Sequence, residues 1–206
     1  MAVSFDLFGT LVTAEMPDDP AMAVAEALRE RDVAVPADFG DAYREVHIDA
    51  PDGAEIPLPA HVAAALSSRD AEAPNNAARR AVVSAFDPTV TRREGALEAI
   101  EAAREHGPVG LCSNCSVPEL VGRTLVRADL RGTFDTVVTS VGCGWRKPDR
   151  RAFEAVARGL DVDACSLVHV GDDPRTDGGI EAIGGRFVDV SKTPLSSLEG
   201  ELESPP

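Results

Sequence analysis

Long apolar runs are missing from this sequence. No stretch of 18 or more apolar residues occurs, which argues against a membrane-spanning helix and a membrane partner. The N-terminal region also has no basic segment followed by an apolar stretch, so we expect no secretion signal and a cytoplasmic protein. With 206 residues, of which 44% are hydrophobic, the chain can still bury a substantial core.

Positive charge is scarce as well. Twenty Lys and Arg residues face 35 Asp and Glu residues, giving a net charge of -15, and this balance argues against nucleic-acid binding. Lysine occurs only at Lys147 and Lys192. An acid excess with so little lysine indicates a halophilic, salt-adapted proteome, where salt screens the repulsion between carboxylates. The alternative is an ordinary acidic protein from a GC-rich genome.

Cysteine is limited to four positions. Cys112 and Cys115 form a CxxC pair, but no second CxxC or Cys/His pair completes a zinc site with four ligands. In a cytosolic chain we expect free thiols rather than disulfides. We expect Cys112 and Cys165 to be buried in apolar surroundings.

Short apolar segments alternate with helical patterns in most of the chain. Five segments are predicted to be strands: Ala2–Leu7, Val109–Cys112, Phe134–Thr139, Ser166–Val170 and Arg186–Val190. Helices are predicted at Glu94–His106, Pro118–Leu130 and Arg150–Arg158, with a shorter one between Thr176 and Gly184. This alternation predicts an α/β fold with a doubly wound parallel sheet.

The segment 14–87 breaks the alternation, because it contains only alanine-rich helical patterns. Four helices are predicted there: Pro20–Arg31, Pro36–Ile48, Pro59–Arg69 and Asn75–Phe86. The loop "APDGAEIPLP" divides them into two pairs. We therefore expect a helical cap at residues 14–87, inserted into a core formed by residues 1–13 and 88–206. The polar tail after Ser191 is expected to be loose.

Polar residues follow the strands of the predicted sheet. The four groups are Asp6 with Gly9 and Thr10, Ser113 with Asn114, Lys147 in "GWRKPDRRAF", and Asp172, Asp173 and Asp177 in "GDDPRTD". In a parallel sheet the carboxyl ends of the strands share one edge, where ligands bind. We therefore expect these groups to meet in one crevice.

Together these groups suggest phosphoryl-transfer chemistry. Asp6 and Asp172 could hold Mg²⁺, which prefers oxygen ligands, with Asp173 or Asp177 as a further ligand or in support. Lys147 would offset the charge of a phosphate, and the hydroxyl of Ser113 could donate to a phosphoryl oxygen. "SVPE", which begins at Ser116, reads as a capping box that would point helix N-terminal amides toward the anion.

The order of these motifs resembles the haloacid dehalogenase-like (HAD) hydrolase superfamily. The matching stretches are "FDLFGTL", "LCSN", "KPD" with "RRAF", and "HVGDDPRTD". The resemblance implies a Rossmann-like core with a helical cap inserted after the first strand. It implies Asp6 as the nucleophile that forms a phosphoaspartyl intermediate, with Thr10 in support. Ser113, Asn114 and Lys147 would hold the phosphate, and the backbone carbonyl of Phe8 would join the Mg²⁺ ligands.

Phe8 departs from the pattern of the family's phosphatases. They usually carry a second aspartate at this position, which acts as general acid and base, and its loss typically costs about 10²–10⁴ in rate. The family's dehalogenases also lack this acid, but they need no metal, whereas this chain keeps an acidic fourth motif. The leading interpretation is a Mg²⁺-dependent phosphatase of a small phosphorylated metabolite. The alternatives are a catalytically weak metal-binding protein with a regulatory role and a metal-independent 2-haloacid dehalogenase.

Overall fold

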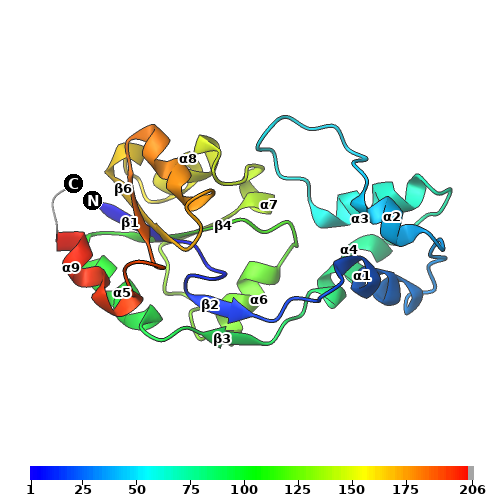
Figure 1. Cartoon of the computed structure of the whole chain (residues 1–206), viewed down its shortest axis with the longest axis horizontal. Helices are drawn as coiled ribbons and strands as arrows, with labels where there is room; N and C mark the ends of the chain where they lie inside the picture. Colours follow the sequence, from blue (N-terminus) through cyan, green and yellow to red (C-terminus); the bar gives the residue numbers. More distant parts are fainter. Residues whose placement is uncertain (204–206) are drawn as a thin grey trace.

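A five-stranded parallel sheet organises the larger lobe of the protein (Figure 1). The structure is a computed structural model and describes residues 1–203. In the order β5-β4-β1-β6-β7 the strands are Thr136–Thr139, Val109–Ser113, Ala2–Phe5, Leu167–Gly171 and Arg186–Asp189. The predicted fold class is therefore confirmed, and all five predicted strands are present within a few residues.

The register of the sheet brings the carboxyl ends of the strands to one edge. Phe5, the last residue of β1, pairs with Leu111 of β4 and with Val170 of β6. Asp6 and Asp172 directly follow β1 and β6, and Ser113 is the last residue of β4, so the three residues lie at nearly the same level. The connections between strands are α5 (Ala96–His106), α6 (Leu120–Arg127), α7 (Ser140–Cys143), α8 (Arg150–Gly159), the short 3₁₀ helix η1 (Ala164–Ser166) and the 3₁₀ helix η2 (Asp177–Ile183).

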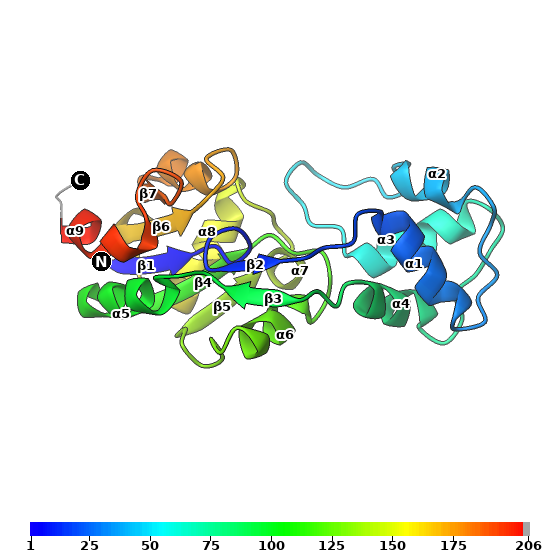
Figure 2. The ribbon, with the colours of Figure 1, turned by 60° about the horizontal axis from the view of Figure 1, so that its bottom comes forward.

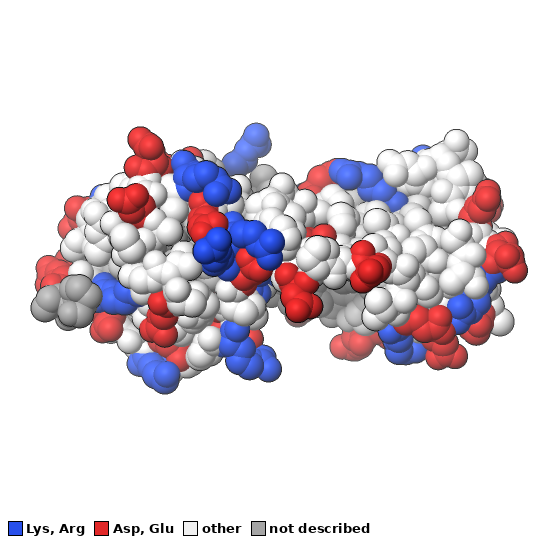
Figure 3. Space-filling model, turned by 90° about the horizontal axis from the view of Figure 1, so that it is seen from above, with Lys and Arg blue, Asp and Glu red and all other residues white. Residues whose placement is uncertain are grey.

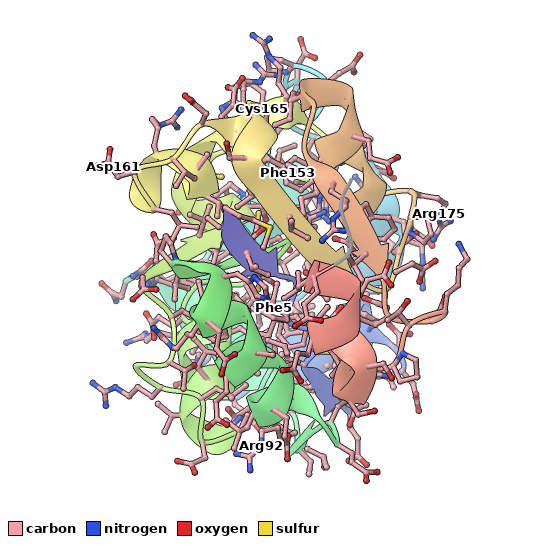
Figure 4. All side chains as sticks on the ribbon, turned by 90° about the vertical axis from the view of Figure 1, so that its left-hand side faces the viewer. Phe5, Arg92, Phe153, Asp161, Cys165 and Arg175 are labelled. Atoms are coloured by element: carbon pink, nitrogen blue, oxygen red, sulfur yellow. The ribbon has the colours of Figure 1, made fainter. Side chains whose placement is uncertain are left out.

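Hydrophobic side chains cover both faces of the sheet, because alternate residues of a strand point to opposite sides. Phe5 belongs to the cluster beneath α5, whereas Phe153 of α8 belongs to the cluster on the other face, as Figure 4 allows the reader to follow. Cys112 is buried in this second cluster, as expected. The expectation for Cys165 was wrong: it follows Ala164 in η1 and is exposed.

A two-stranded antiparallel ribbon, which the sequence analysis missed, connects the core to the smaller lobe (Figure 2). Its strands are β2 (Val12–Ala14) and β3 (Val90–Arg92), and Val12 pairs with Arg92. Three residues are too few to show an alternating pattern, so the sequence carries little signal for either strand. The two strands hold both chain connections to the smaller lobe side by side.

The smaller lobe consists of four helices that lie between β2 and β3 in the chain. They are α1 (Pro20–Arg29), α2 (Phe39–Arg44), α3 (Leu58–Ser67) and α4 (Ala77–Ala85). Figure 1 shows these helices beside the core, at the end opposite the two chain termini, with the loop between α2 and α3 reaching back toward α7. Because β2 ends at Ala14, we propose that the cap begins after this residue.

The chain after Ser191 is ordered against the core, so the expectation of a loose tail was wrong for the described part. The 3₁₀ helix η3 (Leu195–Ser197) leads into α9 (Leu198–Glu203), and both pack on α5. Leu195, Leu198 and Leu202 are buried, because their spacing of three and four residues places them on one helix face. Residues 204–206, which were part of the same expectation, lie outside the described residues.

Charge is distributed unevenly over the surface. On the face seen in Figure 3, acidic and basic side chains lie on both lobes, and a group of basic side chains lies on the core lobe beside the waist between them. Across residues 1–203, no helix combines the length and the apolar character needed to cross a membrane.

The packing of α9 on the core leads to a prediction about the free energy of unfolding. Leu198→Ala should lower the free energy of unfolding by about 2–5 kcal/mol, because the leucine is 1% exposed and its removal leaves a cavity. Its exposed neighbour supplies the control, since Glu199→Ala should change stability by less than about 0.5 kcal/mol. Urea titrations of both variants measure the difference, and equal small effects would show that α9 does not pack on the core in solution.

Candidate active site

The polar groups that follow the strands meet in one hollow of about 270 Å³ at the carboxyl edge of the sheet. Its lining residues are Asp6, Phe8, Asn114, Arg146, Lys147, Asp172, Asp173, Thr176 and Asp177. Two further predicted site residues, Thr10 and Ser113, are buried beside it. The structure thus brings together residues from all four motifs.

Lys147 lies at the centre of this arrangement, and its side chain is 1% exposed. Its Nζ donates to Asp6 Oδ1 at 2.7 Å and to Asp177 Oδ1 at 2.6 Å. Burial opposes the charge of Lys147, but the attraction of the neighbouring anionic groups, Asp6 foremost, outweighs it and holds the lysine pKa above its ordinary value. Lys147 is therefore a fixed cation in contact with the predicted nucleophile.

Asn114 positions the backbone of Lys147. The amide of Asn114 donates to the Lys147 carbonyl at 2.9 Å, and its Oδ1 accepts from the Lys147 N–H at 2.8 Å. This paired contact copies the hydrogen bonding of a neighbouring strand. Asn114 was predicted to bind phosphate, whereas in the structure both of its polar atoms contact Lys147.

Asp172 is supported by the turn that follows β1. Thr10 Oγ1 donates to Asp172 Oδ1 at 3.0 Å, so this hydroxyl supports Asp172, although it was predicted to support Asp6. Gly9 has φ of +87°, and a Cβ there would lie 2.3 Å from Asp172 Oδ2. Only glycine lets the turn approach the carboxylate this closely. Arg93 stabilises the turn by donating hydrogen bonds to the carbonyls of Gly9 and Thr10.

The other two acidic residues of the fourth motif have different environments. Asp177 is buried, and its Oδ1 accepts from Lys147 while its Oδ2 accepts from the Asp173 N–H at 3.1 Å. Asp173 pairs with Arg175, whose side chain is 89% exposed and lies at the outer edge of the core in Figure 4. Asp177 therefore faces the interior and anchors the lysine, whereas Asp173 faces the solvent side.

Sequence reasoning missed a buried histidine beneath this site. His169 Nε2 lies 3.2 Å from Asp177 Oδ1, and its Nδ1 lies 2.8 Å from Ser4 Oγ. Burial first, and then the charge of Lys147, lower the pKa of His169 to about 4, so the ring is neutral at pH 7. A neutral ring that donates from Nε2 to Asp177 must accept from Ser4 at Nδ1. The only sequence signal is a histidine inside a buried strand.

The environment of Asp6 disfavours its charged form. Burial raises the pKa of Asp6 to about 6; Lys147 opposes this shift, and Asp177 adds to it. Four carboxylates line the hollow (Asp6, Asp172, Asp173 and Asp177), together with the cations Arg146 and Lys147. Asp173 pairs with Arg175 and Arg146 pairs with Glu55, so three carboxylates remain against the single ammonium of Lys147. Two negative charges are therefore left over, and a bound cation would favour the ionised form of Asp6.

Ser113 presents an unused donor next to the hollow. Within the described part of the chain, its Oγ is buried and has no hydrogen-bond partner. A buried hydroxyl without a partner is costly, so this atom is available to a ligand.

The predicted capping box at Ser116 was wrong, because α6 begins only at Leu120 and the preceding Glu119 has φ of +67° without a side-chain cap.

The side chains that line the hollow could bind Mg²⁺, because Mg²⁺ does not need a complete set of protein ligands. No group of three or more His, Cys, Asp or Glu side chains within residues 1–203 forms a ready-made metal cluster. Mg²⁺ is usually bound by one or two carboxylates together with waters and substrate phosphate. Asp6 and Asp172, which both line the hollow, supply such a pair.

The chain is similar to known proteins in its sequence pattern and in its fold. The family model for haloacid dehalogenase-like hydrolases matches residues 1–184. A search of curated protein sequences finds no match. Similar solved structures include a HAD phosphatase from Thermococcus onnurineus, with 18% identity, a TM-score of 0.60 and coverage of 98% of this chain and 97% of that one.

Two further similar structures are a dehalogenase and a hydrolase bound to magnesium. One is a 2-haloacid dehalogenase from Pseudomonas syringae pv. Tomato DC3000, with 18% identity, a TM-score of 0.61 and coverage of 98% and 96%. The other is the HAD-hydrolase YfnB from Bacillus subtilis bound to magnesium, with 15% identity, a TM-score of 0.58 and coverage of 97% and 96%. At these identities the likeness establishes the fold.

The raised pKa of Asp6 predicts that Asp6→Asn stabilises the metal-free protein. The unfolded chain ionises Asp6 near its ordinary pKa of 3.8, whereas the folded protein keeps the proton up to about pH 6. Wild-type stability therefore falls, relative to the variant, as pH rises through this window. Above pH 6 the variant should be more stable by on the order of 1–3 kcal/mol.

Urea unfolding in EDTA between pH 4 and pH 8 measures this difference. Asp173→Asn is the matched control, because contact with Arg175 lowers the pKa of Asp173, so that this substitution should give no gain. A stability difference between wild type and Asp6→Asn that stays constant across the whole pH range would contradict the assignment of the raised pKa to Asp6.

Proposed function

Because the chain belongs to the haloacid dehalogenase-like hydrolase family, we propose that it is a Mg²⁺-dependent phosphatase of a small phosphorylated metabolite, with Asp6 as the nucleophile. The observation that carries this proposal is the excess of carboxylate over ammonium around Asp6. Asp172 lines the same hollow as Asp6, and its charge is not neutralised by Lys147, which already pairs with Asp6 and Asp177. A phosphoryl group with a divalent cation matches this charge distribution.

The proposed ligands of Mg²⁺ are Asp6, the backbone carbonyl of Phe8 and Asp172. Thr10 orients Asp172, while Asp177 supports the site by holding Lys147. Asp173 is turned toward Arg175 and would act at most through solvent. When bound, Mg²⁺ neutralises charge on the phosphoryl oxygens and on the attacking carboxylate.

The residues of the chain then divide the reaction between them. Asp6 attacks phosphorus, the bond to the leaving oxygen breaks, and a phosphoaspartate forms. Lys147 and the free hydroxyl of Ser113 donate to the phosphoryl oxygens, where negative charge resides in the transition state. Water next attacks the phosphorus of the phosphoaspartate, and the bond between phosphorus and the Asp6 oxygen breaks. Both protons of the water leave with the phosphate, and Asp6 is regenerated as a carboxylate.

The side chain of Phe8 cannot donate a proton to the leaving group. This side chain is partly buried and packs against the main hydrophobic cluster. Substrates whose leaving groups depart as stable anions should therefore react best, because they need no general acid.

The second candidate is a 2-haloacid dehalogenase, and Phe8 is the observation that favours it. Halide leaves without a proton, so that reaction needs no acid at this position. We rank it lower because the paired carboxylates Asp6 and Asp172 would repel each other without a cation. A metal-binding protein with weak turnover and a regulatory role remains as the third candidate.

Aryl phosphate hydrolysis tests the proposal directly. We expect turnover with Mg²⁺, loss of turnover in EDTA, and no turnover in Asp6→Asn, because the variant lacks the nucleophile. Phosphate release measured at high KCl with and without Mg²⁺ provides the readout. Halide release from 2-haloacids without metal would instead establish the dehalogenase. If neither substrate class reacts but Mg²⁺ still raises the Tm, the result would support the metal-binding protein with a regulatory role.

Phe8→Asp tests the missing acid. The variant should increase hydrolysis of alkyl phosphates by about 10- to 100-fold, because an alkoxide leaving group needs a proton. Aryl phosphates should gain much less, so the ratio of the two kcat/KM values is the quantity to measure. Phe8→Asn is the control, since it makes the same change in polarity and size without supplying an acid. Equal gains in the two variants would show that proton donation is not the limiting feature.

A further inference from the structure

A loop of the cap is docked on the core segment that carries Lys147. We call residues 52–57 of this loop the strap. Glu55 N–H donates to the Gly144 carbonyl at 2.9 Å, and Arg146 N–H donates to the Gly53 carbonyl at 2.9 Å. These two hydrogen bonds form an antiparallel bridge between the strap and the three residues that precede Lys147. Figure 1 shows the loop between α2 and α3 reaching the core near α7.

The strap also places a carboxylate inside the junction between the lobes. The side chain of Glu55 is only 2% exposed, and its Oε2 accepts from Arg146 Nη1 at 2.7 Å and from the hydroxyl of Ser140. Ser140 in turn accepts from the Cys115 N–H at 2.8 Å. A carboxylate buried in this way is stable only while its charged partner and hydrogen bonds are present. Glu55 can therefore stay buried only while the strap is docked against Arg146 and Ser140.

Close packing fixes the position of the strap. Gly53 has φ of +77°, and a Cβ at this residue would lie 2.6 Å from the carboxylate of Asp149. Asp149 is also the N-cap of α8, so it cannot easily move away. A side chain at position 53 would thus force the strap away from the core.

The docked strap contacts the chain segment that carries Arg146 and Lys147. Arg146, which Glu55 holds, lines the active-site hollow, and the next residue in the chain is Lys147. The segment is held by Asn114 from the core side and by the strap from the cap side. Loss of the strap would remove the support on the cap side and leave the backbone contact with Asn114 and the side-chain contact with Asp177.

We propose that Glu55 is a positioning residue through which docking of the cap loop fixes Arg146 and Lys147 in the active site. The role in turnover rests on the proposed phosphatase function, whereas the placement of Lys147 does not. A cap that moves away from the core must separate Glu55 from Arg146, and Lys147 then loses its alignment. Cap docking and assembly of the active site are in this way a single event.

The sequence provides two internal reporters for a test. It contains only two lysines, and Lys147 is buried while Lys192 is 77% exposed. Acylation by an amine-reactive reagent, measured by mass spectrometry of both sites, reports the protection of Lys147 against an internal standard. Trp145 is the only tryptophan and lies in the bridge, beneath the guanidinium of Arg151. Its fluorescence reports docking of the strap.

Glu55→Gln and Gly53→Ala disturb the strap in two independent ways, and Glu72→Gln, at an exposed cap glutamate, is the matched control. In both strap variants we expect several-fold more acylation of Lys147 relative to Lys192 and a red shift of Trp145 emission. For an active enzyme, kcat should fall about tenfold with less change in KM, the loss expected for one charge-assisted hydrogen bond. The control should resemble wild type in every measurement.

Unchanged labelling of Lys147 in both strap variants would overturn the proposal, even if their stability fell. A normal kcat together with increased labelling would also overturn it. Absence of phosphatase activity in the wild type would refute the proposed function only, because labelling and fluorescence in the metal-free protein still decide whether Glu55 positions Lys147. Far-UV circular dichroism selects folded variants, and either strap variant alone is sufficient for the decision.

Discussion

The buried ammonium of Lys147 is the interaction on which the active site depends. It contacts Asp6 and Asp177 from two different strand ends, so it joins parts of the chain that are separated by 141 and 30 residues. Removing such a charge from water is costly, and the carboxylates of Asp6 and Asp177 beside it offset part of that cost. The positions of His169, Asn114 and the strap follow from this need, because each holds either the lysine or one of its partners.

Much of the fold could be predicted because its signals are local. Buried strands such as Val109–Ser113 are short apolar segments, and Gly107 and Gly184 mark the ends of α5 and η2. The ribbon strands escaped prediction because three residues show no period. The tail was misjudged because its polar composition hid the spacing of Leu195, Leu198 and Leu202, which forms an apolar stripe only when the segment is helical.

The candidate site was predictable as a set of residues but not as a set of contacts. A parallel sheet brings strand ends to one edge, which accounts for the meeting of Asp6, Lys147 and Asp172. Which carboxylate contacts the lysine depends on side-chain directions that spacing does not reveal. Asp173 and Asp177 look equivalent in the sequence, yet one pairs with Arg175 at the surface and the other is buried against Lys147.

Burial also explains why substitution of the usual acid need not disable the nucleophile. The charge of Asp6 is set by burial, Lys147 and Asp177, and Phe8 carries no charge that would alter it. Position 8 contributes a backbone carbonyl to the proposed metal site, and any residue supplies that atom. Under the proposed function, Phe8 therefore separates two tasks: attack on phosphorus, which Asp6 would carry out, and protonation of the leaving group, which would pass to the substrate's own chemistry.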